Sequence, residues 1–73
     1  MTRFAERLQQ LRESKRPLRS RKVTSELCGL PPDAIRRYER CEAEPTLSSL
    51  LLLADYFGVT LDELTGRDKK DTG

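Results

Sequence analysis

The chain has 73 residues, of which 36% are hydrophobic and 36% are charged, and its formal net charge is +2. This length allows one small domain with a single core. No run approaches the roughly 18 apolar residues of a membrane-spanning helix, and the N-terminus has no signal-peptide pattern, so we expect a cytoplasmic protein.

The residue types that catalysis and metal binding require are scarce. The chain has two cysteines, Cys28 and Cys41, and no histidine. Two cysteines make no disulfide framework, and without histidine they do not form a typical zinc site. The acids are scattered and supply no nucleophile–base pair. We therefore expect no enzyme activity, no catalytic residue, no metal and no cofactor.

The charge is distributed unevenly along the chain. Residues 1–40 contain 11 Lys or Arg against 5 Asp or Glu, whereas residues 41–73 contain 3 against 7. Such polarity can steer the basic part toward an anionic partner. A well-solvated helical surface explains the same distribution, so charge alone does not decide between the two interpretations.

The first predicted helix spans residues 3–14. Phe4, Leu8 and Leu11 recur at the i, i+4 and i+7 spacing of an apolar helical face. Thr2 can cap the N-terminus of this helix. Proline at position 17 prevents its continuation, and we predict that residues 12–19 form an exposed basic connector.

Two further helices are predicted on either side of a glycine turn. Ser20 can cap a helix over residues 21–28, and Gly29 is suited to the left-handed conformation that ends it. The two prolines that follow favour the first turn of a third helix over residues 32–40, where a missing N–H has no energetic cost. Two helices joined by a tight turn can place the second helix in the major groove of DNA.

A fourth and a fifth helix complete the domain. Thr46 can cap a helix over residues 47–57. Thr60 and Glu63 have the spacing of a capping box that opens a short helix over residues 61–65. The apolar stripes of the five helices predict one core, with the members Phe4, Leu8, Leu11, Leu27, Cys28, Leu30, Ile35, Tyr38, Leu47, Leu50, Ala54, Phe57, Val59 and Leu64.

The C-terminal part of the chain contains two other features. Residues 67–73 are polar and are predicted to be a disordered tail. Positions 50–53 are four consecutive leucines, so not all of them can face one core. We expect Leu52 and Tyr56 to lie outside, where with Leu61 they are either ordinary exposed residues or a dimer patch.

The order of these motifs resembles the Xre/Cro family of helix-turn-helix repressors, the lambda-repressor-like domain. The matching segments are Glu26–Leu30, Ile35, Tyr38–Arg40, Pro45, Leu50–Ala54 and Phe57–Leu64. The resemblance covers Phe4 to Gly66 and implies an all-α, five-helix DNA-binding domain over residues 1–66. It also implies that the second and third helices form the helix-turn-helix and that the third lies in the major groove.

Carried over position by position, the resemblance implies a DNA-binding surface. Its candidate residues are Arg21, Pro32, Asp33, Arg36, Arg37 and Arg40. Arg21 and Arg40 fall at phosphate-contacting positions, with Lys22 beside Arg21, and the other four candidates face the bases. Arginine suits both tasks, because it grips guanine O6 and N7 with two donors and also binds phosphate well. Glu39 matches an acid that is structural in the family, so we leave it out of the site.

Several residues depart from the pattern of the family near this surface. Pro32 can offer a base only an apolar contact, for example to a thymine methyl group. Asp33 would repel phosphate, although its carboxylate can accept a hydrogen bond from cytosine N4. Glu42 and Glu44 occupy a loop that is basic in many relatives, so this loop is expected to contribute nothing to DNA binding or to oppose it.

Two other departures concern helix packing and helix ends. Ser25 stands where the family prefers alanine, and its hydroxyl can bond back to its own helix. Cys41 stands where the family usually has a left-handed glycine. It is either an incidental replacement or an exposed thiol that senses oxidation or joins two chains. Cys28 is expected in the core, and the two cysteines are not expected to pair.

We therefore expect a sequence-specific transcriptional regulator of bacterial or phage origin that binds double-stranded DNA. We expect a repressor that binds as a homodimer to half-sites about one helical turn apart. The alternative is a protein-interaction module on the same fold, with weak or no DNA binding. In that case Leu52, Tyr56 and Leu61 would bind a toxin–antitoxin or regulator partner. Salt separates the two hypotheses, because phosphate binding weakens steeply as salt rises.

Overall fold

Over residues 2–66, which are the residues that the computed structural model describes, the chain forms five α-helices and no strand. The helices are α1 (Thr2–Ser14), α2 (Arg21–Leu27), α3 (Ala34–Glu39), α4 (Leu47–Phe57) and α5 (Leu61–Thr65). The expected all-α, five-helix fold class is confirmed. The predicted disordered tail, residues 67–73, lies outside the described residues.

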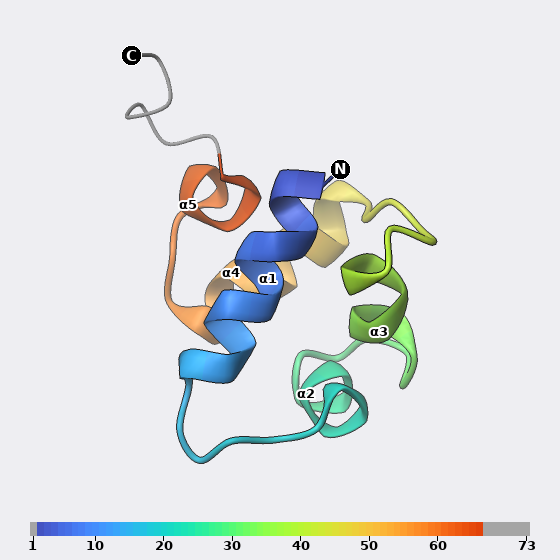
Figure 1. The fold of residues 1–73 in the computed structure, drawn as a ribbon, viewed down its shortest axis with the longest axis vertical. Coiled ribbons are helices and arrows are strands. Elements are labelled where there is room, and N and C mark those ends of the chain that lie inside the picture. The colour runs from blue at the N-terminus through green and yellow to red at the C-terminus, as the bar shows by residue number, and fades with distance from the viewer. Residues whose placement is uncertain (1, 67–73) are drawn as a thin grey trace.

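Helix α1 crosses the centre of the molecule (Figure 1). It packs against α3 on one side and against α5 on the other, and α4 packs on α5. Helices α2 and α3 pack on each other at one end of the domain. Phe4 of α1 meets Tyr38 of α3, with their ring centroids 5.9 Å apart. This contact ties the α2–α3 pair to the rest of the core.

Local hydrogen bonds set most helix ends where the sequence predicts them. Ser20, Thr46 and Thr60 each accept a hydrogen bond from the backbone N–H three residues further on, at 3.1, 3.1 and 3.0 Å. Glu63 completes the predicted capping box. Gly29 ends α2 with a φ of 82°, a left-handed conformation that a side chain would disfavour.

Helix α3 is shorter than the predicted range of 32–40. It begins at Ala34, because Pro32 and Asp33 lie in a turn before it. In that turn the Ala34 N–H donates to the carbonyl of Pro31 at 3.0 Å, an i to i+3 bond of the tighter 3₁₀ kind. The prolines therefore precede the α-helix and do not open it. The remaining differences, at the start of α1 and at the ends of α2 and α3, are one residue each.

One hydrophobic cluster holds the helices together. Its most buried large apolar side chains, each at most 1% exposed, are Phe4, Leu8, Ile35, Leu53 and Leu64. Cys28 and Ala54 are also buried in it, and the predicted members that pack partly against it are Leu11, Leu30, Tyr38, Leu50, Phe57 and Val59. Burial of each large apolar side chain stabilises the fold by about 1.5–3 kcal/mol.

The predicted burial of Leu27 and Leu47 is wrong, because these side chains are 53% and 64% exposed. Leu27 is the last residue of α2, and the next residue, Cys28, turns inward instead. Leu47 is the first residue of α4, one turn before the set at i, i+3, i+4 and i+7 that starts at Leu50 and packs in or against the core. This set includes Leu53, which is fully buried although the sequence analysis leaves it out of the core.

Candidate nucleic-acid interface

An ionic network fixes α3 against α1 and α2. Arg12 Nε and Nη2 donate to the two carboxylate oxygens of Glu39, at 2.7 and 3.1 Å. Arg21 Nε lies 3.4 Å from Oε1 of the same carboxylate. The side chains of Arg12 and Glu39 are only 11% and 6% exposed, so this bidentate pair forms where water is scarce. The hydrogen bond to Glu39 raises the pKa of Arg12 above its ordinary value, and its guanidinium stays charged.

Residues 12–19 were predicted to form an exposed connector; residues 13–19 are exposed, but the prediction is wrong for Arg12, whose side chain is largely shielded from water. Arg12 lies within α1, four residues after Leu8 and eight after Phe4, and therefore on the same helical face as these buried side chains. That spacing is the signal that could have identified it. The interpretation of Glu39 as a structural acid agrees with the geometry, since both of its oxygens are bonded.

The outer side of α3 presents Arg36 and Arg37 to solvent. Neither arginine makes an ion pair with any other described residue. Ile35 and Tyr38, their neighbours in the chain, point the other way and pack in the core. Two guanidinium groups, each with five N–H donors, are therefore available to a ligand on this side of the helix.

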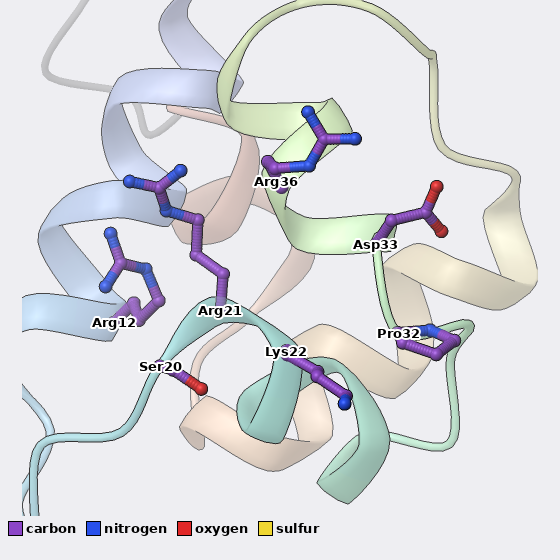
Figure 2. A pocket seen from close by; sticks show the side chains of 7 residues that line it. All are labelled: Arg12, Ser20, Arg21, Lys22, Pro32, Asp33 and Arg36. Atoms are coloured by element: carbon purple, nitrogen blue, oxygen red, sulfur yellow. The ribbon is translucent and has the colours of Figure 1, made fainter.

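A groove of about 570 Å³ lies beside α3, between it and the N-terminal end of α2 (Figure 2). It is lined by Arg12, Ser20, Arg21, Lys22, Pro32, Asp33 and Arg36. The guanidinium groups of Arg12 and Arg21 lie together on one side of the groove, and Lys22 and Pro32 lie on the other. Four of the seven lining residues are basic and Asp33 is acidic. Glu39, which is bonded to Arg12 and lies beside Arg21, offsets one further positive charge, so the groove stays net basic and favours an anion.

The groove brings together four of the six predicted site residues, Arg21, Pro32, Asp33 and Arg36. The other two lie outside it. Arg37 lines a smaller cavity of about 120 Å³, which also includes Asp33 and Glu44. Lys22, the chain neighbour of Arg21 at the start of α2, also lines the groove, on the side opposite the Arg21 guanidinium.

Arg40 has an acidic partner in the loop that follows α3. Its Nε lies 2.9 Å from Oε2 of Glu42, and the two side chains are 60% and 42% exposed. The carboxylate partly neutralises the guanidinium that a phosphate would otherwise bind. The acidic loop was expected to contribute nothing to DNA binding or to oppose it. The ion pair between Arg40 and Glu42 is a specific contact through which it would oppose binding.

Comparison with known proteins identifies the family. A family model described as helix-turn-helix matches residues 8–64. The chain belongs to this helix-turn-helix family, of the Xre/Cro type. The HTH-type transcriptional regulator AnsR of Bacillus subtilis (strain 168) is 38% identical to it over 65 residues. That match covers 89% of this chain and 54% of the relative, so the chain spans about half the length of this relative. No solved structure gives a significant match.

Membership of the helix-turn-helix family confirms the lambda-repressor-like fold. The family is one of transcriptional regulators and not of enzymes, in agreement with the prediction from the sequence. None of the helices in the described range 2–66 is long and apolar enough to cross a membrane. Within the same range, no group of three or more potential metal-ligating side chains is found.

The two cysteines of this helix-turn-helix domain occupy different environments. Cys41 is exposed and has a φ of 59°, a left-handed conformation that ordinarily favours glycine. Its N–H donates to the Tyr38 carbonyl at 3.1 Å and the N–H of Glu42 donates to that of Arg37 at 2.8 Å, which closes the helix end. Cys28 is buried and unpaired, as expected, and burial raises the pKa of its thiol to about 11.

The three residues of the predicted dimer patch differ in exposure. Leu52 is 42% exposed, whereas Tyr56 and Leu61 pack partly against the core. The Tyr56 ring stands edge-on to Phe57, with centroids 4.9 Å apart, and Lys15 Nζ lies 5.0 Å from the Tyr56 centroid. One face of the tyrosine is therefore already covered by the cation of Lys15, the first residue after α1.

Proposed function

We propose that this helix-turn-helix domain binds double-stranded DNA sequence-specifically, with α3 in the major groove, and that it serves as a transcriptional regulator. The observation that carries the proposal is the basic groove beside α3, which exposed Arg36 lines, together with exposed Arg37; neither arginine has an acidic partner among the described residues. The ionic network on the inner side of the same helix supports it, because a held helix presents these arginines in a defined direction.

The proposed base contacts follow from the chemistry of each side chain. The major groove is about 12 Å wide and admits an α-helix. Arg36 and Arg37 would each donate two hydrogen bonds to guanine O6 and N7. Pro32 would offer an apolar contact to a thymine methyl group, and Asp33 would accept from cytosine N4 if a base pair presents it.

The proposed phosphate contacts flank α3. Arg21 and Lys22, at the start of α2, would bind one phosphate. Arg21 is 46% exposed and can do so while it stays beside Glu39, because its guanidinium has several donors. Arg40 would approach a second phosphate, and Glu42 would weaken that contact.

The similarity to a B. subtilis protein named as a transcriptional regulator supports the regulatory role. We further propose that the chain represses transcription and that it binds as a homodimer. Two copies related by two-fold symmetry would place their α3 helices in successive major grooves, about one helical turn apart. The cognate site would therefore be an inverted repeat.

The test is DNA binding by wild type and by Arg37→Ala. Duplexes are enriched from a random pool by the protein, and anisotropy then gives the affinities for an enriched and a scrambled duplex at two salt concentrations. The wild type should prefer the enriched duplex and should bind both less tightly at high salt. Arg37→Ala should weaken the enriched complex by about tenfold or more and the scrambled complex much less.

Arg16→Ala is the matched control, because it removes one exposed arginine from the connector after α1. It should leave the preference for the enriched duplex intact. An equal loss on both duplexes for Arg37→Ala would mean that this side chain contacts only phosphate. A pool from which nothing is enriched would contradict sequence-specific binding.

A second candidate function, a protein-interaction module, is favoured by one observation. Helix α4 exposes Leu47, Leu51 and Leu52, whose side chains are 64%, 51% and 42% exposed. If neither duplex binds at low salt, this apolar surface becomes the stronger candidate site. Leu51→Glu should then abolish self-association or a partner complex in sedimentation velocity, and the complex should persist at high salt because it does not depend on phosphate.

A further inference from the structure

The N-terminus of α3 lacks the side-chain cap that α2, α4 and α5 have. Ser20, Thr46 and Thr60 have extended backbones, with ψ of 164°, 167° and 164°, and each accepts a hydrogen bond from its own helix. Asp33, at the corresponding position before α3, has a φ of −99° and a ψ of 8° and makes no such bond. The Ala34 N–H donates to the carbonyl of Pro31, so it is the next N–H of α3, that of Ile35, that needs an acceptor from elsewhere in the molecule.

That acceptor is a hydroxyl of the preceding helix. The Ile35 N–H, in the first turn of α3, donates to Ser25 Oγ at 3.1 Å. Ser25 is fully buried, and its own hydroxyl proton goes to the carbonyl of Arg21 at 2.8 Å. The hydroxyl thus uses its donor within α2 and accepts from α3. One buried side chain links the backbones of the two helices.

We infer that Ser25 is a positioning residue for DNA readout: its hydroxyl caps α3 from α2 and sets the direction in which Arg36 and Arg37 project. The inference rests on the proposed function. Ile35 directly precedes Arg36, and α3 has only six residues, so few hydrogen bonds of its own resist tilting or fraying. Without the hydroxyl, a buried N–H would lack a partner and the first turn would move toward water or toward another acceptor.

Such a movement matters because base readout is geometrically demanding. A bidentate arginine–guanine contact needs both donors aligned with O6 and N7. Binding sites generally require their contact groups to be held within about 0.5 Å and 10–20° of the productive geometry. Phosphate contacts are more tolerant, since they depend mainly on charge. Loss of the Ser25 hydroxyl should therefore reduce discrimination between sequences more than overall affinity.

Thr24 provides a matched control on the same helix. It is 2% exposed, and its Oγ1 donates to the carbonyl of Ser20 at 2.8 Å, just as Ser25 donates to that of Arg21. No hydrogen bond joins the Thr24 hydroxyl to α3. Thr24→Val and Ser25→Ala each remove one buried hydroxyl with little change in volume, and only the second removes the link between the helices.

The experiment compares wild type, Ser25→Ala and Thr24→Val at a temperature at which circular dichroism shows all three folded. The ratio of affinities for the enriched and the scrambled duplex is measured by anisotropy, and hydrogen exchange is measured at the Ile35 amide. We expect Ser25→Ala to lower the affinity ratio about tenfold, the size of one base contact, and to speed exchange at Ile35. Thr24→Val should leave both quantities near their wild-type values.

The outcomes separate this inference from the proposed function. If the wild type prefers the enriched duplex and Ser25→Ala prefers it equally, the hydroxyl adds only stability and the inference is overturned. If the wild type binds both duplexes equally, the proposed function fails and this inference fails with it. If Ser25→Ala does not fold, Ser25→Cys keeps a weak acceptor at the same place and should lower the ratio by a smaller factor; an unchanged ratio would then overturn the inference.

Discussion

The two sides of α3 place the same residue type in opposite environments. On the inner side, Arg12 reaches α3 from α1, is 11% exposed and donates two hydrogen bonds to Glu39. On the outer side, Arg36 and Arg37 are exposed and have no acidic partner among the described residues. A guanidinium that is largely shielded from water needs an acidic partner, so the inner arginine holds the fold, whereas the outer arginines are available to bind.

The comparison also shows how little the number of arginines says about an interface. Arg12 and Arg40 both lie near the proposed DNA surface, yet Glu39 bonds to one and Glu42 to the other. The inner pair is bidentate and shielded from water, while the outer pair is exposed and worth much less. Substitutions on the two sides of α3 should therefore have different consequences, for stability on the inner side and for DNA binding on the outer side.

The largest effect is expected from Glu39→Gln on the inner side. It leaves the Arg12 guanidinium without a carboxylate where water is scarce, so the free energy of unfolding should fall by about 3 kcal/mol. Urea denaturation measures this change. Glu13→Gln is the control, because Glu13 is 55% exposed and lies 3.8 Å from the same arginine. Its effect should be under about 0.5 kcal/mol, and equal effects would contradict the distinction between the two sides.

The second effect is expected from Arg36→Ala on the outer side. Binding to the enriched duplex should weaken by about 1–3 kcal/mol, while the free energy of unfolding should change by less than about 0.5 kcal/mol. Anisotropy and urea denaturation measure the two quantities on one preparation. Arg36→Lys keeps the charge but loses the planar guanidinium with its two parallel donors. It should therefore retain the affinity for the scrambled duplex and lose the preference for the enriched duplex. A large fall in the free energy of unfolding would show that Arg36, like Arg12, holds the fold, and would contradict its assignment to DNA binding.

The third effect concerns pH and the buried thiol of Cys28, whose pKa rises from an ordinary 9.0 to about 11. Between these values the unfolded chain has lost the thiol proton and the folded chain retains it. The part of the free energy of unfolding that is linked to this proton is therefore fully present below pH 9. It falls as pH rises toward 11, by about 1 kcal/mol between pH 8 and pH 10. Urea denaturation across this range measures the loss. Cys28→Ala should lack this part of the pH dependence, and an unchanged slope would contradict the assignment.

The smallest effect is expected from Glu42→Gln, which releases Arg40 from its exposed ion pair. Affinity for both duplexes should rise a few-fold, and the salt dependence should steepen by about one phosphate contact. Anisotropy at several salt concentrations measures both. In an Arg40→Gln background the gain should disappear. A gain of the same size in that background would show that Glu42 acts through general charge and not through Arg40.

Much of the fold could be predicted from local signals in the sequence. Ser20 and Thr46 mark helix starts, and the capping box of Thr60 opens α5 as expected, because these hydrogen bonds involve residues three apart. The exposure of Leu47 could not be predicted this way. Helical periodicity identifies an apolar face, but it does not say where along the helix the core ends.

The candidate site was less predictable, because its determinants join distant parts of the chain. Arg12 and Glu39 are 27 positions apart, and only the packing of α1 on α3 brings them together. The hydrogen bond from the Ile35 N–H to Ser25 also crosses between helices, so the sequence of either helix alone could not predict it. The roles of Arg36 and Arg37 were predicted from family resemblance and stay predictions until DNA binding is measured.

The most direct test of the central claim is a titration of ¹⁵N-labelled protein with the enriched duplex, followed by amide chemical shifts. If the outer side of α3 binds DNA, the largest changes should occur at the start of α2 and along α3, including Lys22, Arg36 and Arg37, with small changes at Asp55 and elsewhere on α4. Changes concentrated around Leu47 and Leu51 on α4, or the absence of any change at low salt, would contradict the claim that the outer side of α3 binds DNA.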